Sequence, residues 1–366
     1  MRKKIKVGID VTPLAGNPTG IGGFVEAIGS GLAESTEIDV TGVVVSYKGR
    51  GEIDQKIPDG MALKHIKFPA RLAHLTWHKA DWPALHGFDI VHGTNYVVPP
   101  AGGARELVTI HDLSAWKYPE LLDTSTRNFP TLVTRSLERG AHIHTVSDFV
   151  AEEIKEHLKI SAEKIHVIKN GFKKQNLGKS ENGKKIAGGE YIFAIGTIEP
   201  RKDYPTLIKA MSKISEIFPN LKLVIAGSDG WGIEAFDAAT AKYDPDNKII
   251  RLGYVDEQTR ADLLAGAEVL VYPSLYEGFG LPLLEAMSAG IPVVSTDVGS
   301  IPEVAGDAAV LVPAKSSNAL AGAILDVLES DEVRKHLIAS GTKRLEKFSW
   351  DDSVTKMIEL YKTMVQ

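Results

Sequence analysis

The chain of 366 residues contains no cysteine. This absence excludes disulfide bonds, thiol catalysis and cysteine-ligated zinc, and it fits a reducing compartment. No apolar run approaches the roughly 20 residues that a membrane-spanning helix needs. The first residues, MRKKIKVGIDV, lack a long apolar segment and a small-residue cleavage site, so we expect a strand there and not a signal peptide. The expected location is the cytoplasm.

The sequence also lacks an excess of positive charge, since its net charge is −5 at pH 7. Lys and Arg exceed Asp and Glu by only 3 in residues 1–180 and fall short of them by 8 in residues 181–366. Nucleic-acid-binding proteins usually carry a pronounced basic face, so no nucleic-acid partner is expected. The glycines at residues 20–23 do not form a P-loop, because no Gly-Lys-Ser/Thr follows them, and they also miss the G-x-G-x-x-G spacing of dinucleotide folds. The second absence counts against a nicotinamide-dependent enzyme, the alternative from a different class.

Strand-like and helix-like segments alternate along the chain. Short apolar runs such as KIKVGIDV, EYIFAIGT and AEVLVYPS alternate with helical patterns such as SDFVAEEIKEHL and YPTLIKAMSKISEIF. Near-continuous apolar strands are typical of parallel sheets that are covered on both faces. We therefore predict an α/β protein with two Rossmann-like, doubly wound domains, because a chain of this length exceeds one ordinary core. Ligands bind beyond the carboxyl ends of the strands in such sheets.

The polar, Gly- and Lys-rich stretch at residues 173–189 is predicted to be the linker between the domains. It separates an N-terminal domain, residues 1–172, from a C-terminal domain, residues 190–348. Residues 349–366 begin with the N-cap candidate Ser349 and continue with an amphipathic pattern. We expect them to form a helix that packs back on the N-terminal domain.

A first candidate site is the glycine cluster Gly20, Gly22 and Gly23, between the first strand and a helix. Glycine lets a ligand approach the backbone, and a helix N-terminus attracts phosphate. A tight strand-to-helix turn explains these glycines equally well.

A second candidate lies in GTIEPRKDYPTLIKA, where Gly196 ends a strand and Arg201 and Lys202 precede a helix. The fork of an arginine and the point charge of a lysine suit a diphosphate. The simpler interpretation is a solvated basic pair beside Glu199 and Asp203. For a bare Arg-Lys pair that simpler interpretation is the stronger one.

The third candidate, PSLYEGFGLPLLEAMSAG, carries Glu277 and Glu285 around a Gly-Phe-Gly turn. Pro282 suits the first turn of a helix that Gly290 would end, so free N–H groups and the positive end of the helix dipole are expected beside this turn. Such a turn would bind phosphate, and the carboxylates would accept hydrogen bonds from a ribose and a sugar. Helix capping explains one glutamate, but it does not explain the turn, the proline and both acids together.

His111 and Asp112 follow another predicted strand, in VTIHDLSAWKYPE. A single histidine is most simply structural. Its position at the carboxyl end of a strand favours a functional role, because ligands bind at that edge of the sheet.

Together these segments resemble the retaining GT-B glycosyltransferases of group 1, also called family 4, and most of all their mannosyltransferase-like branch. The resemblance rests on the two glutamates in EGFGLPLLEAMSAGIPVV, the STDVGSIPEV that follows them, and GTIEPRKD. TVSDF, IKNG and VTIHDLSAWKYPE extend it over nearly the whole chain. It implies two Rossmann-like domains that face each other across a cleft, the first of which is on the acceptor side and the second of which binds the nucleotide sugar.

The resemblance also implies a role for each motif. Arg201 and Lys202 would bind the donor diphosphate and act in catalysis. Glu277 would contact the transferred sugar, and Glu285 would hold the ribose. His111 would lie beside the reacting centre and position the sugar. The other implied donor-binding residues are Gly22, Gly23, Gly196, Phe279, Gly280 and Leu281, largely through their backbone.

Two departures from the family pattern bear on the site. Relatives often have Gly-Arg where this chain has Gly196-Thr197, so Arg201 would take over the role of that arginine. Relatives usually read Pro-Asn-Gly-Val where this chain has Lys-Asn-Gly-Phe at residues 169–172, which changes the local shape and not the expected fold.

The resemblance implies GDP-mannose as the donor, with a UDP-sugar as the alternative, and a glycan or lipid-linked glycan as the acceptor. No Asp-x-Asp motif stands where a donor-bridging metal ion would need it, so we expect neither metal nor cofactor. Protein cations would stabilise the leaving diphosphate. A phosphorylase-like or sugar-phosphate synthase activity shares the fold. A non-catalytic binder would be expected to lack Glu277, Arg201 or Lys202.

Residues 63–87 mix Lys67, Arg71 and Lys79 with phenylalanine and tryptophan. One interpretation is an amphipathic segment that contacts the inner face of a membrane peripherally. The alternative, which we favour, is a helix that buries its aromatic side chains and solvates its charges.

Overall fold

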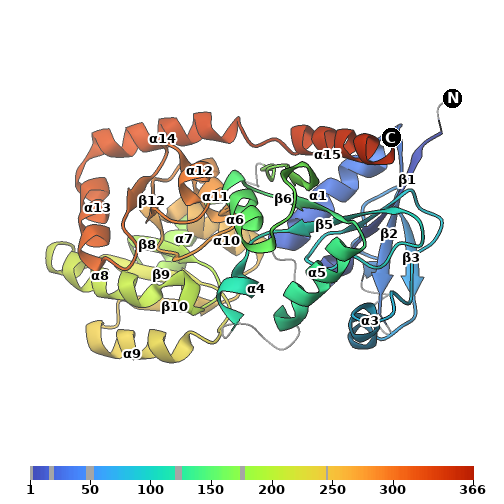
Figure 1. Ribbon diagram of the computed structural model, residues 1–366. Coiled ribbons are helices and arrows are strands. Elements are labelled where there is room, and N and C mark those ends of the chain that lie inside the picture. The colour runs from blue at the N-terminus through green and yellow to red at the C-terminus, as the bar shows by residue number, and fades with distance from the viewer. Residues whose placement is uncertain (1–2, 16–19, 47–52, 120–125, 174–177, 245) are drawn as a thin grey trace. The chain divides into compact units, whose positions relative to one another are not determined.

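The computed structural model describes the whole chain except residues 1–2, 16–19, 47–52, 120–125, 174–177 and 245. The chain divides into two compact units (Figure 1). Unit 1 comprises Met1–Gly171 and Ser349–Gln366, and unit 2 comprises Phe172–Phe348. Each unit has its own parallel sheet, as expected of a chain with two α/β domains.

The sheet of unit 1 has the strand order β3-β2-β1-β4-β5-β6-β7, and all its pairs are parallel. The chain adds strands outward from β1 on one side and then from β4 on the other, so the direction of winding reverses between these two strands. The strands are β1 (Ile5–Asp10), β2 (Ile38–Val45), β3 (Ala62–Ile66), β4 (Ile90–Gly93), β5 (Arg105–Ile110), β6 (His142–Thr145) and β7 (Ile165–Val167).

Helices cover both faces of this sheet, and the sheet contributes to two apolar clusters. One cluster joins the side chains of Val7, Ile9 and Leu107 to α1 and α15, and the other joins Val108, Ile110 and Ile143 to α5 and α6. This alternation follows from the period of two residues along a strand. The helices of unit 1 are α1 (Gly20–Glu34), α3 (Ala70–Trp77), α4 (Ser114–Lys117), α5 (Phe129–Glu138), α6 (Asp148–Leu158) and α15 (Trp350–Val365).

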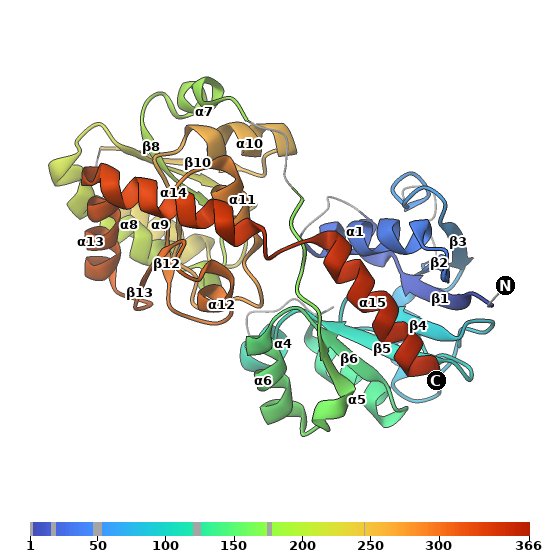
Figure 2. The same cartoon turned by 90° about the horizontal axis from the view of Figure 1, so that it is seen from above.

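The C-terminal helix α15 belongs to unit 1 and lies beside α1 (Figures 1 and 2). It begins at a side-chain cap, because the Ser349 hydroxyl accepts a hydrogen bond from the Asp352 N–H at 3.3 Å. Its apolar stripe, Met357, Leu360, Tyr361 and Met364, is buried in the same cluster as β1 and α1. Unit 1 thus buries the apolar face of this amphipathic helix.

Buried histidines tie α15 to the sheet. His92 on β4 contacts the Tyr361 hydroxyl at 2.7 Å through Nδ1 and the Thr109 hydroxyl at 2.7 Å through Nε2. Thr109 also contacts His144 Nδ1 at 3.0 Å. Burial lowers the pKa of His144 to about 3 and holds that of His92 well below its usual range. Both imidazoles are therefore neutral in the folded protein at neutral pH.

Unit 1 should lose stability in mild acid. The unfolded chain takes up protons at both histidines below pH 6.5, whereas in the folded chain burial keeps His144 neutral until about pH 3 and also lowers the pKa of His92, so the free energy of unfolding falls as the pH falls below 6.5. Burial raises the pKa of Asp10 to about 6, so protonation of this one carboxylate stabilises the folded state as the pH falls and offsets part of the loss. We expect a net loss of about 2–3 kcal/mol between pH 7.5 and pH 5, measured by hydrogen exchange at the amides of α15 and β6.

The matched variants are His144→Gln and His336→Gln, since His336 is exposed on helix α14 (Asp331–Leu345) of unit 2. The first should flatten the pH dependence of exchange in unit 1, and the second should leave it unchanged. Protection of α15 that is constant or rises between pH 7.5 and pH 5 would contradict this account.

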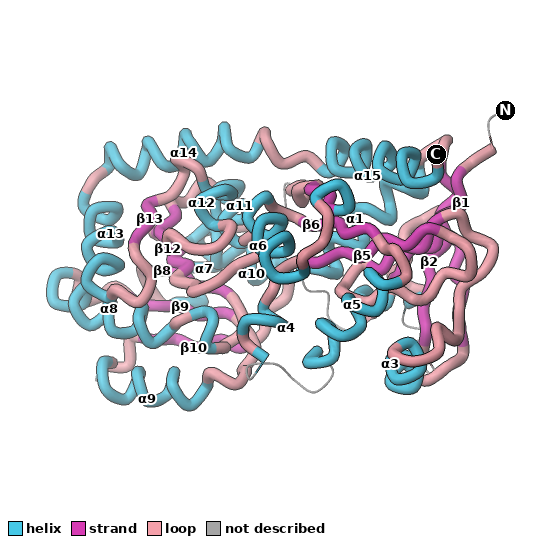
Figure 3. Tube along the Cα trace, viewed as in Figure 1, coloured by secondary structure: helices cyan, strands magenta, loops and turns pink. Residues whose placement is uncertain are grey.

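The sheet of unit 2 has the order β10-β9-β8-β11-β12-β13 and repeats the winding of unit 1. Its central strands are almost wholly buried apolar runs, because helices pack on both faces (Figure 3). The winding reverses between β8 and β11, which are direct neighbours. The strands are β8 (Tyr191–Ile195), β9 (Lys222–Ala226), β10 (Ile249–Gly253), β11 (Val269–Tyr272), β12 (Val293–Thr296) and β13 (Val310–Val312).

Two groups of helices pack in unit 2. Helices α8, α9 and α13 share one apolar cluster with the sheet, and contacts link α7 to α10, α10 to α11, and α11 to α14. The helices are α7 (Ser180–Ala187), α8 (Tyr204–Ile217), α9 (Ile233–Tyr243), α10 (Glu257–Gly266), α11 (Leu281–Ala289), α12 (Ile301–Ala305), α13 (Ser317–Glu329) and α14 (Asp331–Leu345).

Two expectations about local structure are wrong. Residues 173–189 are not a linker throughout, because α7 occupies residues 180–187, and Asp262 of α10 accepts hydrogen bonds from the Lys179 N–H and the Asn182 amide. Residues 63–87 are not one helix, because strand β3 comes first and α3 spans only Ala70–Trp77. Among the described residues, no helix is both long and apolar enough to cross a membrane.

Candidate functional site

The predicted basic pair and Glu277 meet at the edge of the unit 2 sheet, where the winding reverses. Gly196 follows β8, and Arg201 and Lys202 end a short 3-10 helix in the loop to α8. Glu277 lies in the loop after β11, the neighbour of β8. The Leu275 N–H donates to the Arg201 carbonyl at 2.7 Å and joins the two loops. This is the edge at which doubly wound sheets bind ligands.

Glu277 binds both cations through separate oxygens. Arg201 Nη1 donates to Oε2 at 3.0 Å and Lys202 Nζ donates to Oε1 at 2.6 Å. Arg201 also donates to the Tyr276 carbonyl at 2.9 Å and to Glu199 at 2.6 Å. We call Arg201, Lys202 and Glu277 the charged cluster.

The charged cluster is buried, since Glu277 is 6% exposed and Lys202 is 7% exposed. Burial alone would raise the pKa of Glu277, but the charges of Arg201 and Lys202 outweigh it and lower the pKa to about 2. Burial lowers the pKa of Lys202, and the charge of Glu277 opposes this shift. The basic pair is therefore not the solvated pair that the local sequence favours, because a carboxylate some 75 residues further along the chain closes over it.

One N–H donor of Lys202 has no hydrogen-bond partner among the described residues. An ammonium group has three N–H donors, and Lys202 Nζ uses one toward Glu277 and one toward the Tyr272 hydroxyl. The part of the chain that the structure describes supplies no third acceptor. A buried ammonium donor without a partner is costly, so a ligand oxygen at this position would be stabilised.

Gly196 makes room for the Lys202 side chain. Its φ of +139° lies in the region that favours glycine, and a Cβ there would lie 3.1 Å from Lys202 Cε and 3.3 Å from the Tyr204 hydroxyl oxygen. The Tyr204 hydroxyl donates to the Gly196 carbonyl at 2.8 Å, which closes the turn. The role of Gly196 is thus to shape the loop that carries the basic pair.

Gly196→Ala should destabilise unit 2 by about 1–3 kcal/mol because of its backbone conformation, and it should lower activity because the new methyl group displaces Lys202. Urea unfolding and turnover measure the two effects. The control is Gly322→Ala on α13, where a Cβ meets no atom within 4 Å and should add up to about 1 kcal/mol of stability. An alanine at 196 that leaves both quantities unchanged would show that the turn tolerates a side chain.

Ser300 holds the loop that carries Glu277. Its N–H donates to the Glu277 carbonyl at 3.1 Å, and its hydroxyl contacts the carbonyl oxygens of Glu277 and Phe279 at 3.1 Å and 3.0 Å. Phe279 packs edge-on against Phe348 at 5.7 Å, so its ring belongs to the core of unit 2. A contact of Phe279 with a ligand would accordingly come from its backbone.

Gly280 precedes α11 with a φ of +102°, and Leu281 and Pro282 form the first turn. No side chain caps this helix N-terminus. Its free N–H groups and the positive end of the dipole are suited to an anion. The described geometry therefore supports a phosphate site beside Glu277.

Glu285 has a different surrounding from Glu277. It lies on α11, is mostly buried, and forms an ion pair with Arg260 of α10, with 3.2 Å between Glu285 Oε1 and Arg260 Nη1. Nothing in the local sequence pointed to Arg260, because the pairing depends on how α10 packs against α11. The two glutamates of the motif are thus held by different partners, and the ribose contact of Glu285 stays a prediction.

His111 lies at the carboxyl edge of the unit 1 sheet. Its Nε2 lies 2.8 Å from the Thr94 carbonyl, and burial lowers its pKa. A neutral imidazole that donates through Nε2 presents Nδ1 as an acceptor. Asp112 accepts hydrogen bonds from the Tyr96 hydroxyl and the Ser114 N–H and hydroxyl, which orders the turn beside His111. The turn thus holds a neutral His111 with Nδ1 as its acceptor, and its contact with the transferred sugar stays a prediction.

The expectation that Gly22 and Gly23 precede the helix is wrong, because both lie in the first turn of α1. Residues 16–19 of the same motif lie outside the described residues. A Cβ at Gly23 would meet no atom within 4 Å, so packing does not require glycine there. This open space is consistent with the approach of a ligand to α1, and the role of Gly22 and Gly23 stays a prediction.

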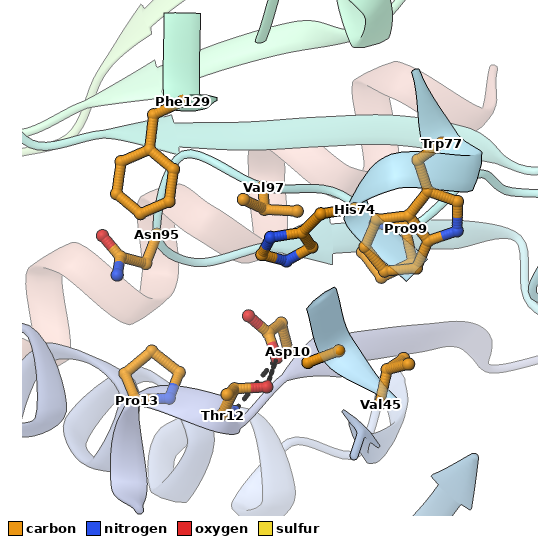
Figure 4. A pocket seen from close by; sticks show the side chains of 11 residues that line it. Asp10, Thr12, Pro13, Val45, His74, Trp77, Asn95, Val97, Pro99 and Phe129 are labelled. Atoms are coloured by element: carbon orange, nitrogen blue, oxygen red, sulfur yellow. Dashed lines mark hydrogen bonds between the residues drawn. The ribbon is translucent and has the colours of Figure 1, made fainter. Parts of the chain in front are cut away.

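Unit 1 contains a pocket that the sequence did not reveal (Figure 4). It lies beyond the carboxyl ends of β1 and β4, and its lining includes Asp10, His74, Trp77, Asn95 and Phe129. These residues come from β1, α3, α5 and the loop after β4, so no local pattern marks them. Among the described residues, no group of three or more His, Asp or Glu side chains is arranged to hold a metal ion.

Comparison with known proteins gives the family. Residues 179–344 match the model described as "Glycosyl transferases group 1", and residues 18–175 match that of "Glycosyltransferase Family 4". The O-antigen chain mannosyltransferase B of Escherichia coli is 33% identical over 284 residues, which are 75% of this chain and 74% of that protein. The chain belongs to the group 1 (family 4) glycosyltransferases. It is thus a hexosyltransferase.

Other proteins are similar to part of this chain in sequence or to nearly all of it in fold. A phosphatidyl-myo-inositol mannosyltransferase of Mycolicibacterium smegmatis is 32% identical to this glycosyltransferase over 183 residues, 48% of the chain and 46% of that protein. A sucrose-phosphate synthase from Thermosynechococcus elongatus superposes with a TM-score of 0.76 at 20% identity and covers 98% of this chain and 99% of its own. HepE of Anabaena, solved with UDP and glucose, has a TM-score of 0.73 at 16% identity over 98% of this chain and 100% of its own. The glycosyltransferase has the GT-B fold, as predicted.

Proposed function

We propose that this glycosyltransferase transfers mannose from GDP-mannose to a glycan or lipid-linked glycan with retention of the anomeric configuration, and that it needs no metal ion. The observation that carries the proposal is the buried charged cluster at the winding reversal of unit 2, with the unsatisfied donor of Lys202. A diphosphate supplies the oxygens that this donor and the N-terminus of α11 lack.

The charged cluster would act mainly on the leaving group. Departure of the nucleoside diphosphate develops negative charge, which Lys202, Arg201 and the N–H groups before α11 stabilise without reorganising. These groups supply the positive charge that a divalent ion provides in other transferases. A phosphate oxygen would then take the proton of the acceptor hydroxyl on the same face of the sugar, so the configuration is retained.

The remaining residues would bind the donor. Glu277, ionised at any pH well above 2, would contact the transferred sugar, and Glu285 would hold the ribose. Nδ1 of His111 would accept a hydrogen bond from a sugar hydroxyl, since Nε2 is engaged by Thr94. Gly22 and Gly23 would allow close approach to α1. No side chain is assigned as a covalent nucleophile.

The choice of mannose as the transferred sugar is supported by the names of the relatives, and the guanosine base rests on the resemblance of the sequence motifs. The proteins from Escherichia coli and Mycolicibacterium smegmatis are mannosyltransferases, as is RfbU of Salmonella typhimurium, which is 28% identical over 250 residues. HepE, solved with UDP-glucose, favours the alternative of a UDP-sugar donor, but its identity to this chain is lower. The names of two of these relatives refer to O-antigen chains, which supports a role in polysaccharide synthesis.

The test of the proposal is the configuration of the product formed in the presence of EDTA. The enzyme would be incubated with GDP-mannose and a set of neutral oligosaccharides, and the new linkage would be read from its one-bond C1–H1 coupling by NMR. We expect a linkage with the same anomeric configuration as the donor and a rate that EDTA leaves unchanged. An inverted linkage, or activity that appears only with a divalent ion, would overturn the mechanism.

Helix α3 of unit 1 supports the proposal of a peripheral contact with a membrane. It turns Leu72 and Leu75 outward, 49% and 61% exposed, and Trp82 is 58% exposed nearby. Lys67, Arg71 and Lys79 are exposed in the same segment. The favoured alternative, a helix that buries its aromatic side chains, is wrong for Trp82. Exposed apolar and basic side chains together suit an anionic lipid surface.

The basic residues should contribute about 1 kcal/mol each to vesicle binding. The triple change Lys67→Ala, Arg71→Ala and Lys79→Ala should therefore lower partitioning onto vesicles with 30% anionic lipid by roughly 100-fold, measured by flotation at low salt. The control replaces three exposed lysines of unit 2, Lys209, Lys335 and Lys347, with alanine and should bind as before. Equal binding of the two triple variants would remove the membrane contact.

A further inference from the structure

The last residue of β11, Tyr272, contacts the charged cluster from the sheet. Its hydroxyl accepts a hydrogen bond from Lys202 Nζ at 2.5 Å, and Nζ lies 4.5 Å from the centroid of the Tyr272 ring. Tyr272 is 3% exposed and Lys202 is 7% exposed. The contact is therefore made away from solvent, where a hydrogen bond is electrostatically stronger than in water.

Tyr272 is held by the sheet, whereas Lys202 is carried by a loop. Tyr272 pairs with Ser295 of the neighbouring strand β12, and its carbonyl accepts a hydrogen bond from the Ser295 hydroxyl at 2.7 Å. Lys202 ends a short 3-10 helix in the loop between β8 and α8, and its four-carbon side chain is flexible. Groups on strands are placed more precisely than groups on loops. Tyr272 can therefore act as the fixed reference for the position of Nζ.

Two acceptors from different segments determine where the ammonium group of Lys202 lies. Glu277 Oε1 accepts at 2.6 Å from the loop after β11, and the Tyr272 hydroxyl accepts from the strand itself. The three N–H bonds of an ammonium point in different directions, so engaging two of them fixes the direction of the third. Without the hydroxyl, Glu277 would be the remaining acceptor among the described residues, and Nζ would be free to shift toward that carboxylate.

The acceptor that Tyr272 provides is uncharged. Burial, the charge of Glu277 and a hydrogen bond to Glu277 hold the pKa of the Tyr272 hydroxyl well above its usual range, so the hydroxyl stays protonated at neutral pH. A second carboxylate in its place would neutralise Lys202 further and would repel a diphosphate. A phenol orients the ammonium and leaves its charge available to an anion.

We propose that Tyr272 is a positioning residue of the transfer reaction, whose hydroxyl fixes Lys202 so that its third N–H donor faces the leaving diphosphate. The inference rests on the proposed function for the role of Lys202, and on the geometry of the contact for the role of Tyr272. Tyr272 acts through Lys202 and does not itself touch the donor.

The first experiment removes only the hydroxyl. Tyr272→Phe keeps the ring beside Nζ, and we expect turnover, followed as GDP release from GDP-mannose, to fall about 10-fold or more because the donor to the developing charge is misplaced. GDP affinity should fall less than about threefold, because the charge of Lys202 remains. This split separates the variant from Lys202→Met, which removes the charge as well.

The matched control is Tyr191→Phe at the start of β8. The Tyr191 hydroxyl is also buried in unit 2 and donates to the Leu263 carbonyl at 2.6 Å, so its loss has a similar cost in stability. Urea unfolding should show comparable losses in the two variants, but Tyr191→Phe should keep wild-type turnover. Full turnover in Tyr272→Phe, or equal losses of turnover in both variants, would overturn the inference.

The second experiment follows the charge of Lys202 through the pH dependence of turnover. The hydrogen bond to Tyr272 favours the ammonium form, so its loss should lower the pKa of Lys202 further, and the alkaline limb of the profile should move to lower pH. The other charged or titratable side chains around the cluster are Arg201, Glu199, Asp203, Tyr204 and Glu277. All of them are the same in the wild type and the variant, so an alkaline limb that does not move would contradict the proposal.

The third experiment tests whether Tyr272 acts through Lys202. In the Lys202→Met background, Tyr272→Phe should lower turnover by less than about twofold, because the ammonium that the hydroxyl positions is already gone. Losses that multiply would show that the hydroxyl acts on the site independently of Lys202, and the proposal would fail.

Failure of this inference is distinguishable from failure of the proposed function. A wild-type protein that binds GDP, loses it in Lys202→Met and is indifferent to Tyr272→Phe keeps the proposed function and loses this inference. A wild-type protein that binds no nucleotide and releases no GDP from GDP-mannose refutes the proposed function first, and the role of Tyr272 with it.

Discussion

Lys202→Met is expected to lower turnover by about 10²–10³-fold, the cost of removing one preorganised charge from a developing anion. Methionine keeps most of the buried volume but none of the three N–H donors, one of which has no partner in the described chain. GDP should also bind about 10–100-fold more weakly, because a charge-assisted hydrogen bond to phosphate is lost. Initial rates and calorimetric titration measure the two losses.

The control for this variant is Lys209→Met, which places the same side chain on an exposed position of α8. It should keep wild-type turnover and GDP affinity. A Lys202 variant that folds and keeps full turnover would show that the charged cluster is structural, and the assignment of the donor site to unit 2 would fail with it.

Glu277→Gln is expected to separate binding from turnover. The pKa of Glu277 is lowered to about 2, so the wild-type side chain is ionised throughout the working pH range. Removing its charge leaves Arg201 and Lys202 less neutralised, and a diphosphate should bind at least as tightly. Turnover should still fall by about 10²–10³-fold, since the contact with the transferred sugar in the transition state is lost.

Three measurements on the Glu277 variant decide between roles. Turnover and GDP affinity show whether the variant loses catalysis while it keeps nucleotide binding. A urea titration checks folding, because two buried cations lose their counter-charge. If GDP binding fell as far as in Lys202→Met while turnover of bound donor was unchanged, Glu277 would only position the cations. The opposite signs of the two variants on GDP affinity thus distinguish a sugar contact from a scaffold.

Much of the fold follows from local patterns. Buried apolar runs such as those of β8, β9 and β11 predicted a covered parallel sheet, and the carboxyl ends of the strands predicted where Gly196, Arg201 and Glu277 would gather. Strand β3 escaped prediction because it lies at the sheet edge, where its half-exposed residues show no clear alternation. Helix α7 escaped because its stability comes from contacts with α10 and not from its polar sequence.

In the candidate site, too, the local sequence indicates some features and only the tertiary structure shows the others. The spacing of Glu277 and Glu285 marked the motif, yet only the fold shows that one pairs with Lys202 and the other with Arg260. The local sequence made the Arg-Lys pair look solvated, because Glu277 is distant along the chain. The pocket around Asp10 had no signal at all, since its walls come from segments that only the tertiary structure brings together.

The most direct test of the account is a metal-free calorimetric titration of the purified enzyme with GDP, UDP, GDP-mannose, UDP-glucose and NAD. The account predicts binding of GDP and GDP-mannose, their loss in Lys202→Met, and no binding of NAD. Preference for UDP and UDP-glucose would keep the site and replace the donor. Failure of every nucleotide to bind, or binding that is indifferent to Lys202, would contradict the central claim that the charged cluster of unit 2 holds a nucleotide sugar.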